Sequence, residues 1–340
     1  EMNNDVFTRR TVKIVANVTI AGDTVTVDFT GTDPQMRSFK NSSLANTYAS
    51  VYLAMATLVD PFMPKNQGMF RPVTIVAPRG TVVNPEPPAP LTYSTVYPTI
   101  QIVHAIWKAL AQALPQRISA GWGATAYPTM AGYRDGEGYV MYHWSGSSGA
   151  GGIKGRDGFN QIGSLNTLGG LMLPDMELYE QVYPAHFVRC EFRTDAAGAG
   201  EYRGGSGVDY EVKITEPAKW GFRGESCYTP TGFGVNGGRA GKEASTVLDP
   251  GTPQEREAPQ YAIVELPPSG FRLLSAGGGG WGDPLHRDPE AVRCDVRNEL
   301  VSLGAARDLY GVVLDPTTLA VDAPATAARR CELAAAAGRA

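Results

Sequence analysis

A loop dense in small residues and carrying two charges is the stretch of this sequence best suited to chemistry. Residues 145–152 read Ser-Gly-Ser-Ser-Gly-Ala-Gly-Gly, and Lys-Gly-Arg-Asp-Gly follows at 154–158. Small residues let backbone N–H groups approach a ligand closely, and Arg156 and Asp157 add charge beside them. We therefore predict a substrate pocket or an interface element; the alternative is a surface loop in which Arg156 and Asp157 pair with each other. The candidate substrate-binding residues here are Ser147, Ser148, Gly151 and Gly152.

A second glycine-rich stretch, residues 275–284, reads Ser-Ala-Gly-Gly-Gly-Gly-Trp-Gly-Asp-Pro. Four consecutive glycines permit positive φ and close backbone approach. A flexible linker would continue with Gly and Ser, whereas this run ends in Trp281, a ring that favours burial. Two interpretations are open: a tight turn fixed by a buried tryptophan, or a backbone nest or wall beside a ligand.

Motifs for several common catalytic chemistries are absent from the sequence. There is no GxSxG nucleophile elbow and no recognisable Ser-His-Asp set. Gly241-Lys242 precedes Glu243 where a phosphate-binding loop requires Ser or Thr, so a Walker site is rejected. The histidines have no HxH or HExxH spacing, so no complete metal site is expected in this chain. A spatial cluster of His143 and His186, both on predicted strands, stays open. The four histidines are His104, His143, His186 and His286.

Composition narrows the class of protein. A chain of 340 residues with 43% hydrophobic and 19% charged residues is typical of a globular protein with one to three domains. A net charge of −4 predicts no nucleic-acid-binding face. No apolar run reaches the ~18 residues of a membrane span, and no signal peptide opens the sequence. The cysteines lack CxxC spacing, so we expect reduced thiols and a cytoplasmic location. They are Cys190, Cys227, Cys294 and Cys331.

Hydrophobic periodicity predicts a mixed first half. Residues 11–29 read as a β-hairpin that turns at Ala21-Gly22-Asp23. Ser42 or Ser43 caps a helix that runs to about Val59 and is stopped by Asp60-Pro61. A short strand at 73–77, a helix at 98–114 and a buried strand at 139–144 are also expected. His104 lies beside the apolar stripe of the 98–114 helix and is expected to be packed rather than catalytic.

The second half is predicted to be rich in short strands. Their spacing indicates an antiparallel sandwich or a barrel-like module. The strands are expected at 187–193, 207–214, 220–224, 246–248, 262–266 and 271–275. Asp288 and Pro289 start a helix that Gly304 ends, and the alanine-rich tail at 323–340 is helical or frayed.

The predicted fold class is α+β, with a mixed helix and sheet N-terminal part, a β-rich antiparallel C-terminal module and a terminal helix. Three parts are expected. They are a substrate-chamber part at 1–184, a β-rich module at 185–287 and a C-terminal helical segment at 288–340.

Four motifs, in the same order along the chain, resemble hydantoinase B proteins. The family also covers the matching half of 5-oxoprolinases and related subunits of acetone and acetophenone carboxylases. The resemblance spans about residues 25–312. The motifs are VDFTGT at 27–32 with Pro34-Gln35, NQG at 66–68 with FRP at 70–72, GEYRGGSG at 200–207, and GGGGWGDP at 277–284 followed by Asp288-Pro289 and Tyr310-Gly311-Val312.

The resemblance implies that this chain works within a hetero-oligomer. In this family ATP, with Mg²⁺, is generally used by a hydantoinase A-like partner, and the B-type subunit helps to build the substrate or metal chamber. A divalent metal such as Mn, Zn or Fe is a candidate for that complex. The metal-ligand region usually lies upstream of the DFTGT-like motif. We therefore expect this chain to be a C-terminal part, a split-gene product or a processed subunit that acts with the remaining B region.

Two segments depart from the family pattern and leave the substrate open. Residues 161–168 read Gln-Ile-Gly-Ser-Leu-Asn-Thr-Leu, where many hydantoinase B proteins have histidines and a Thr-Asn-Thr run. Residues 92–97 read Thr-Tyr-Ser-Thr-Val-Tyr in place of a Gly-Asn-Val-Glu-like pattern. Asn166, in the first of these segments, is a further candidate for substrate binding.

The leading hypothesis is a subunit of an ATP-dependent cyclic-amide hydrolase of the hydantoinase or oxoprolinase type. Phosphorylation of the amide oxygen would make the ring carbonyl carbon a better electrophile for water. Arg156, Asp157 and Arg203 are the candidate catalytic residues, and either arginine or the backbone amides of the glycine loops could stabilise the developing oxyanion. Two alternatives stay open: a subunit of an ATP-dependent ketone carboxylase, and a non-catalytic scaffold subunit of such a complex.

Overall fold

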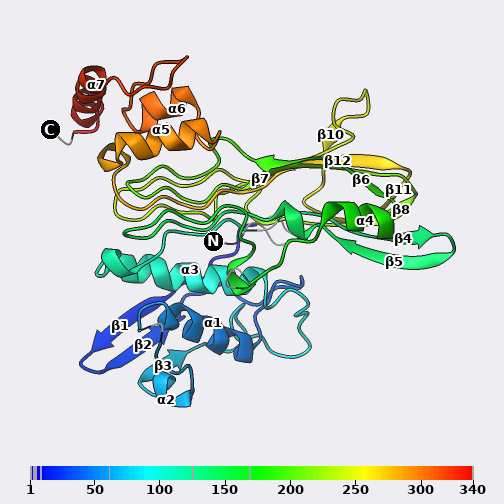
Figure 1. Cartoon of the computed structure of the whole chain (residues 1–340). Coiled ribbons are helices and arrows are strands. Elements are labelled where there is room, and N and C mark those ends of the chain that lie inside the picture. Colours follow the sequence, from blue (N-terminus) through cyan, green and yellow to red (C-terminus); the bar gives the residue numbers. More distant parts are fainter. Residues whose placement is uncertain are drawn as a thin grey trace. The chain divides into compact units, whose positions relative to one another are not determined.

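The computed structural model describes residues 2, 6–7, 10–60, 62–124, 126–167 and 170–338 (Figure 1). The chain divides into two compact units, Glu1–Ile118 and Ser119–Ala340. The predicted boundaries at 184/185 and 287/288 both fall within the second unit and stay predictions. Pro61, Leu168 and the last two residues of the predicted tail lie outside the described residues.

The first unit contains a small sheet that begins with the predicted hairpin. Strands β1 (Asn17–Ala21) and β2 (Thr24–Asp28) are antiparallel, and β3 (Val73–Val76) pairs with β2 in parallel. Gly22 at the turn has φ +60°, a value that suits glycine because it has no Cβ. The first strand is shorter than expected. Ile20, near the end of β1, is 53% exposed.

Two helices pack against each other in the first unit, as their apolar stripes predict. Helix α1 (Leu44–Ala56) is capped by Ser43, whose side chain accepts a hydrogen bond from Asn46 N at 3.2 Å. Helix α3 (Tyr97–Ala111) has a proline in its first turn. His104 on α3 is buried, which agrees with a packed histidine. A short helix α2 (Gln67–Phe70) precedes β3, and a 3-10 turn (Pro115–Arg117) follows α3.

The second unit contains two separate antiparallel sheets, which favours the sandwich over the barrel-like module that the sequence also left open. One sheet has the order β10-β9-β12-β7-β6 and the other has the order β11-β8-β4-β5. The strands of the first are β6 (Ala185–Phe192), β7 (Val208–Ile214), β9 (Ser245–Leu248), β10 (Arg256–Glu257) and β12 (Ser269–Leu274). The strands of the second are β4 (Thr129–Arg134), β5 (Glu137–Tyr142), β8 (Ala218–Arg223) and β11 (Tyr261–Leu266). Helix α4 (Met176–Val182) lies beside β6 (Figure 1).

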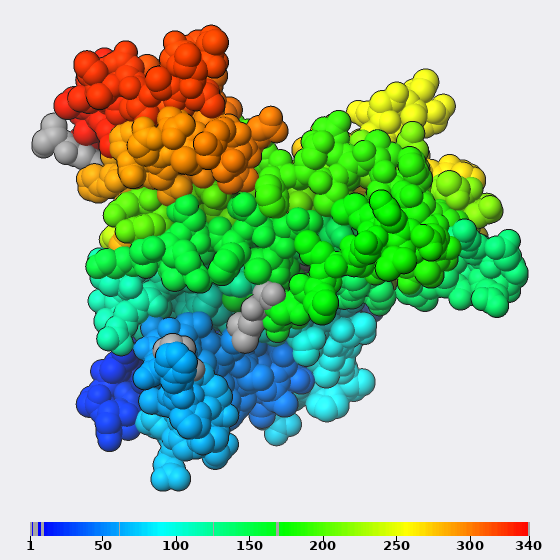
Figure 2. All heavy atoms as spheres, in the orientation of Figure 1, coloured from blue at the N-terminus to red at the C-terminus, as the bar shows by residue number. Residues whose placement is uncertain are grey.

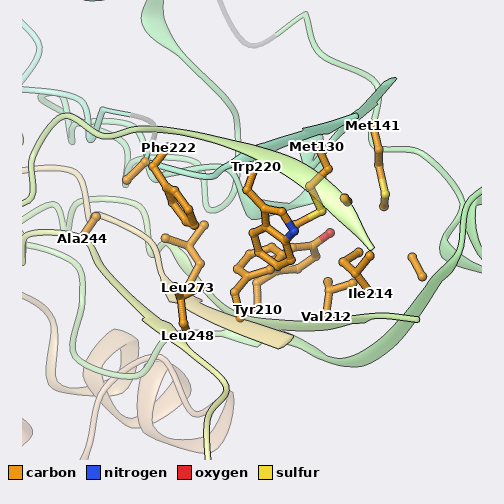
Figure 3. Packing of buried hydrophobic residues seen from close by; sticks show 14 of the residues in the cluster. Met130, Met141, Tyr210, Val212, Ile214, Trp220, Phe222, Ala244, Leu248 and Leu273 are labelled. Atoms are coloured by element: carbon orange, nitrogen blue, oxygen red, sulfur yellow. The ribbon is translucent and has the colours of Figure 1, made fainter. Parts of the chain in front are cut away.

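Large side chains from both sheets fill the space between them (Figure 3). Trp220 from β8 and Phe271 from β12 are both buried, with ring centroids 5.8 Å apart in an edge-to-face arrangement. Strands β4 and β5 contribute Met130 and Met141, although sequence periodicity did not single out β4. The strand predicted at 139–144 is present as β5, but the prediction that it is buried was wrong. Only Met141 of β5 is buried, because alternate side chains point away from the sandwich core.

Buried between the sheets is a histidine whose charge state couples to stability. His143 Nδ1 lies 2.9 Å from the Tyr210 hydroxyl, and the ring packs edge-on against Phe271. Burial lowers the pKa of His143 from 6.5 to about 3, so the ring is neutral near pH 7.

We expect this histidine to make the second unit less stable in mild acid. Between pH 6.5 and 3 the unfolded chain binds a proton at His143 that the folded chain does not, so stability falls as pH falls through this window. The slope is about 1.4 kcal/mol per pH unit. Urea unfolding should therefore show that the free energy of unfolding of the parent protein is about 2 kcal/mol lower at pH 5 than at pH 7. The His143→Gln variant should not show this loss. The exposed His186→Gln is the control, and equal losses in all three proteins would contradict the idea.

A bundle of extended, glycine-rich segments lies beside the sandwich in the second unit (Figure 1). The glycine run 277–280 runs through it, and each of its N–H groups donates to a carbonyl of another segment. The acceptors are Lys242 O, Gly205 O, Gly121 O and Arg239 O, at 2.8–3.0 Å. A Cβ on Gly278 would lie 1.8 Å from Ala150 O, so only glycine permits this backbone approach.

Neither sequence interpretation of this run describes it fully. Trp281 is buried, as the first interpretation required, but positive φ occurs at Gly282 and not within 277–280. The nest interpretation was wrong, because carbonyls of the protein itself already occupy the N–H donors of the run.

Three helices form a compact layer at the end of the chain (orange to red in Figure 2). They are α5 (Pro289–Arg297), α6 (Leu303–Leu309) and α7 (Ala323–Ala336). The prediction of one helix from Pro289 to Gly304 was wrong. Glu299 adopts φ +59° between α5 and α6, and Ser302 caps a new helix by accepting from Ala305 N. The alanine-rich tail is helical up to Ala336.

The confirmed fold class is a mixed α+β fold with mostly antiparallel sheets and a terminal helix. Within the described part of the chain, every helix is too short or too polar to cross a membrane.

Candidate functional site

The small-residue loop at 145–152 is built into the glycine-rich bundle. Its N–H groups at Gly149, Ala150 and Gly152 donate to carbonyls of other bundle segments. Ser147 and Ser148 are fully buried, and their hydroxyls donate to Trp144 O at 2.6 Å and to Ala124 O at 2.9 Å. Substrate binding by Ser147, Ser148, Gly151 and Gly152 stays a prediction, and these contacts place the four residues in the interior of the second unit.

Arg156 and Asp157 do not pair with each other. The guanidinium of Arg156 is exposed and lies over the ring of Phe159, with its carbon 4.5 Å from the ring centroid. Asp157 instead binds Arg287 through two hydrogen bonds of 2.7 and 2.6 Å. The alternative of a self-paired surface loop was therefore wrong, and Arg156 is an exposed residue without Asp157 as its partner.

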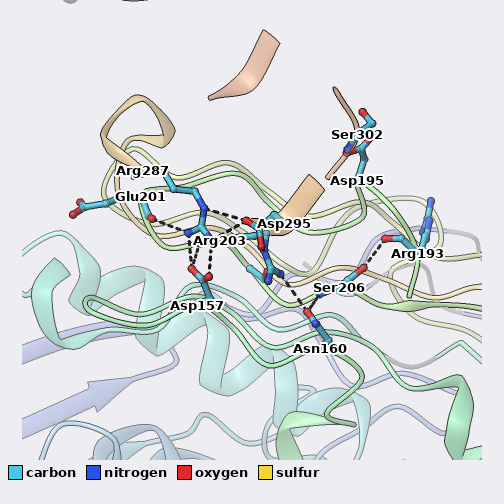
Figure 4. A network of polar contacts seen from close by, with 11 residues as sticks. Asp157, Asn160, Arg193, Asp195, Glu201, Arg203, Ser206, Arg287, Asp295 and Ser302 are labelled. Carbon is cyan, nitrogen blue, oxygen red and sulfur yellow. Dashed lines mark hydrogen bonds and ion pairs between the residues drawn. The ribbon is translucent and has the colours of Figure 1, made fainter. Parts of the chain in front are cut away.

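A buried network of alternating charges holds this loop to the end of the chain (Figure 4). Arg287 contacts Asp295 at 2.8 Å as well as Asp157, and Arg203 Nε lies 3.3 Å from the other Asp295 oxygen. Arg203 is only 5% exposed, and it also donates to Asn160 Oδ1 and Gly204 O. The backbone N–H of Arg203 donates to Asp157 Oδ1 at 2.8 Å. Arg203 thus joins the loop at 200–207 to the loop at 153–158 and to α5.

The charges in this network stabilise one another. Burial alone would raise the pKa of the Asp157 carboxyl, but the hydrogen bonds and charge of Arg287, aided by Arg203, hold that pKa below its ordinary value. Burial would lower the pKa of Arg287, and Asp157 and Asp295 outweigh it, so that pKa is raised. Buried charges persist when they are paired and hydrogen-bonded in this way. Asp157 and Arg287 therefore both remain ionised near neutral pH.

Sequence reasoning missed two members of this network, Arg287 and Asp295. One signal could have found Asp295: it lies next to Val296 and three residues after Val292, on the side of α5 that faces the protein. A charged residue on a buried helical face requires a partner of opposite charge. Arg287 carried no comparable signal, because it follows a 3-10 turn (Pro284–His286) whose direction the sequence does not reveal.

Asn166 offers an acceptor that no hydrogen bond reaches within the described residues. It lies in a 3-10 turn (Leu165–Thr167), and its Oδ1 atom is buried. A buried acceptor without a partner is costly in a folded protein and often marks a position that a ligand or water completes.

The histidines are not brought together. His143 lies in the sandwich core, whereas His186 on β6 is exposed, with its Nδ1 3.1 Å from Glu180. Among the described residues, no three His, Cys, Asp or Glu side chains are grouped so that they could hold a metal ion. The residues that the structure describes thus do not fit the divalent metal considered for the complex.

Sequence comparison relates this chain to a protein family and to solved structures. A family profile described as Hydantoinase B/oxoprolinase matches residues 1–284. The caprolactamase subunit beta of Pseudomonas jessenii is 36% identical over 325 residues, which cover 89% of this chain and 54% of that protein. The chain therefore spans about half the length of this relative.

Two solved structures share the fold. The crystal structure of ATP-dependent caprolactamase from Pseudomonas jessenii aligns with a TM-score of 0.82 and 33% identity, covering 93% of this chain and 56% of that chain. A nucleotide-free acetone carboxylase aligns with a TM-score of 0.80 and 21% identity, covering 94% of this chain and 48% of that chain, and this likeness shows the fold alone. The profile match over most of the chain, together with the order of its glycine-rich motifs, shows that the chain belongs to the hydantoinase B/oxoprolinase family.

Proposed function

We propose that this chain forms part of the B-type subunit of an ATP-dependent cyclic-amide hydrolase. The observation that carries the proposal is its 36% identity to a caprolactamase subunit beta over 89% of the chain. The proposed partner is a hydantoinase A-like subunit that binds ATP and Mg²⁺. Because the chain spans about half of the relative, the complete B-type function would require the remaining B region as well.

The proposed reaction opens a stable ring amide in two stages. When ATP is bound by the partner, it supplies a phosphoryl group to the amide oxygen and so turns that oxygen into a leaving group. Water then adds to the ring carbon, and the ring C–N bond breaks with the amine as leaving group, which leaves an acyl phosphate. A second water hydrolyses this acyl phosphate to give the amino acid and phosphate. Since negative charge develops on oxygen during water addition, a cation or a polarised N–H nearby would accelerate the step.

Among the candidate catalytic residues, Arg156 is best placed to meet a substrate. Arg156 is exposed, whereas Asp157 accepts hydrogen bonds from Arg287 and from the backbone N–H of Arg203. The Arg203 side chain is engaged as well, because it donates to Asp295, Asn160 and Gly204 O. We assign Arg203 and Asp157 a positioning role: they fix the loop that carries Arg156. Asn166 Oδ1 could accept the N–H of the cyclic amide, because it is a buried acceptor without a partner among the described residues.

The test is ATP turnover by the complex assembled with its natural partner subunit. Hydantoins, 5-oxoproline and larger lactams are assayed without bicarbonate, and ketones with and without it. Stimulation by a cyclic amide in the absence of bicarbonate supports the hydrolase. A strict requirement for a ketone plus bicarbonate would support the carboxylase instead. That alternative rests on the sequence departures at 92–97 and 161–168, since the likeness to acetone carboxylase concerns the fold alone.

The exposed arginine gives a sharp mutational test of the chemistry. Arg156→Ala should lower kcat of the assembled enzyme by about 100-fold, the loss expected for an oxyanion donor. Lys154→Ala is the matched control, because Lys154 is an exposed cation two residues away in the same loop. Size-exclusion chromatography should show both variants in intact complexes. If Arg156→Ala assembled and turned over like the parent, the catalytic role would be wrong and the scaffold alternative would be favoured.

A further inference from the structure

An open cleft of about 690 Å³ lies on the second unit, where the end of β6 comes close to the turn that follows α5. Small-molecule sites typically have volumes of about 300–1,000 Å³. The cleft lies apart from the loop that carries Arg156 and takes its lining from segments distant in sequence. Among its lining residues are Gln161, Arg193, Lys242, Asn298 and Glu299.

Some of the charges that line this cleft neutralise each other. Arg189 lies 3.4 Å from Asp209 and 3.6 Å from Glu191, and Asp209 also binds Arg272. Three lining charges are left over: Arg193, Lys242 and Glu299. Within the described residues none of these three side chains forms an ion pair. The cleft therefore presents two cations and one anion to a ligand.

Arg193 is the most informative of the three, because it is partly buried and bonded only to neutral groups. Its Nη1 donates to the carbonyls of Glu243, Leu274 and Ser275 at 2.7, 3.3 and 3.0 Å. Burial lowers the pKa of Arg193, although the charges of Glu243 and Asp209 oppose this. A partly desolvated guanidinium without an ion-pair partner gains most from an anion that binds it directly. Figure 4 shows that the backbone carbonyl of Arg193 accepts a hydrogen bond from Ser206, whereas the side chain of Arg193 points away from Asp295.

Backbone strain is concentrated around the same cleft. Gln161 and Glu299, both lining residues, have φ of +47° and +59°, and Asp195, which follows the lining residue Thr194, has φ +57°. Non-glycine residues rarely adopt this region, and such strain clusters at ligand sites where the surrounding structure enforces it.

We propose that this cleft binds a small amino acid, whose carboxylate contacts Arg193 and Lys242 and whose ammonium group contacts Glu299. An amino acid has a negative group for the two unpaired cations and a positive group for the unpaired anion, although its net charge is zero. A ring-opened lactam carries the same two groups, so the cleft would bind the product of the proposed reaction when the substrate is a lactam; this link, but not the binding itself, rests on the proposed function.

Isothermal titration calorimetry on the full chain, without ATP or partner, tests the proposal. The probes are 6-aminohexanoate, which has both charged groups, and hexanoate and hexylamine, which have one each. We expect saturable binding of 6-aminohexanoate and binding at least about tenfold weaker for each single-charge probe, since each loses one ion pair. Absence of binding by 6-aminohexanoate at millimolar concentration would overturn the proposal without affecting the proposed hydrolase.

Variants assign the binding to the cleft. Lys242→Gln and Glu299→Gln should each weaken the binding of 6-aminohexanoate about tenfold. Of these two variants, only Lys242→Gln should also weaken the binding of hexanoate, because hexanoate has no ammonium group to contact Glu299. Lys213→Gln, an exposed lysine on β7 outside the cleft lining, is the control and should bind like the parent. Arg193→Gln should abolish carboxylate binding, and Lys242→Gln keeps the test valid if Arg193→Gln misfolds. Unchanged affinity in Lys242→Gln and Glu299→Gln would place the ligand elsewhere and refute the site.

Discussion

Replacing Gly278 with alanine should destabilise the second unit by at least about 3 kcal/mol, enough to prevent soluble expression if the parent is only moderately stable. The added Cβ would lie 1.8 Å from Ala150 O, well inside van der Waals contact. The obstructing atom belongs to the backbone, so no side-chain rotation can relieve the clash. Movement of the Gly278 segment would also break the hydrogen bond from Gly278 N to Gly205 O, and movement of the Ala150 segment would break the one from Gly205 N to Ala150 O. Urea unfolding, or the soluble yield, measures the loss.

A glycine without such a neighbour provides the control. Gly304 lies in helix α6, and a Cβ there would meet nothing closer than Ser302 Oγ at 3.8 Å. Gly304→Ala should raise stability by about 0.5–1 kcal/mol, because alanine favours the helix and restricts the unfolded chain. A Gly278→Ala variant that unfolds within about 1 kcal/mol of the parent would show that the bundle can open without cost, contrary to its packing.

The contrast between these two glycines explains what the sequence could and could not predict about the fold. The strands of the sandwich follow a period of two in hydrophobicity, and most of those predicted after residue 185 occur within a few residues of their expected bounds. The glycine-rich bundle has no such period. Its segments are joined by hydrogen bonds between distant parts of the chain, and a run such as 277–280 reveals close approach but not the neighbour that approaches.

The exposed side of the sandwich shows a second limit. Val140 and Tyr142 on β5 have the residue types of a core strand, yet they are 58% and 40% exposed. Type alone predicts burial, whereas the side to which each residue points depends on pairing with β4. The break between α5 and α6 was missed for a related reason. Glu299 adopts a left-handed conformation that residue propensity does not favour, so only the tertiary structure specifies it.

At the candidate site, the sequence identified the charged residues but not their partners. Arg156, Asp157 and Arg203 stood out because they are charged residues among glycines. Their environments differ greatly: Arg156 is exposed, whereas Arg203 is 5% exposed in an ion network. The difference is made by Arg287 and Asp295, which approach from the C-terminal segment. Long-range pairing of this kind leaves no spacing pattern in the sequence, so the distinction between exposed and structural arginines required the structure.

Removing Asp295 should cost about 3–5 kcal/mol of stability, the range measured when one partner of a buried ion pair is deleted. Asp295 is 6% exposed and contacts both Arg203 and Arg287. In Asp295→Ala the two arginines keep only Asp157, so one positive charge is left buried without compensation. Asp308→Ala is the control, since Asp308 pairs with Arg307 and Arg329 at the surface, where solvent screens the ion pairs, and its loss of stability should be much smaller than that of Asp295→Ala.

A double variant separates lost charge balance from lost packing. Arg203→Met with Asp295→Leu removes one charge of each sign and leaves the pair formed by Arg287 and Asp157. If the unpaired buried charge causes most of the loss in Asp295→Ala, the double variant should be more stable than Asp295→Ala, because apolar replacements of a buried pair are often tolerated. If it is less stable than either single change, the network acts mainly through the hydrogen bonds from Arg203 to Asn160 and Gly204. Either result shows how the C-terminal segment fixes the loop that carries Arg156, because Asp157 lies in that loop and binds Arg287 from the C-terminal segment.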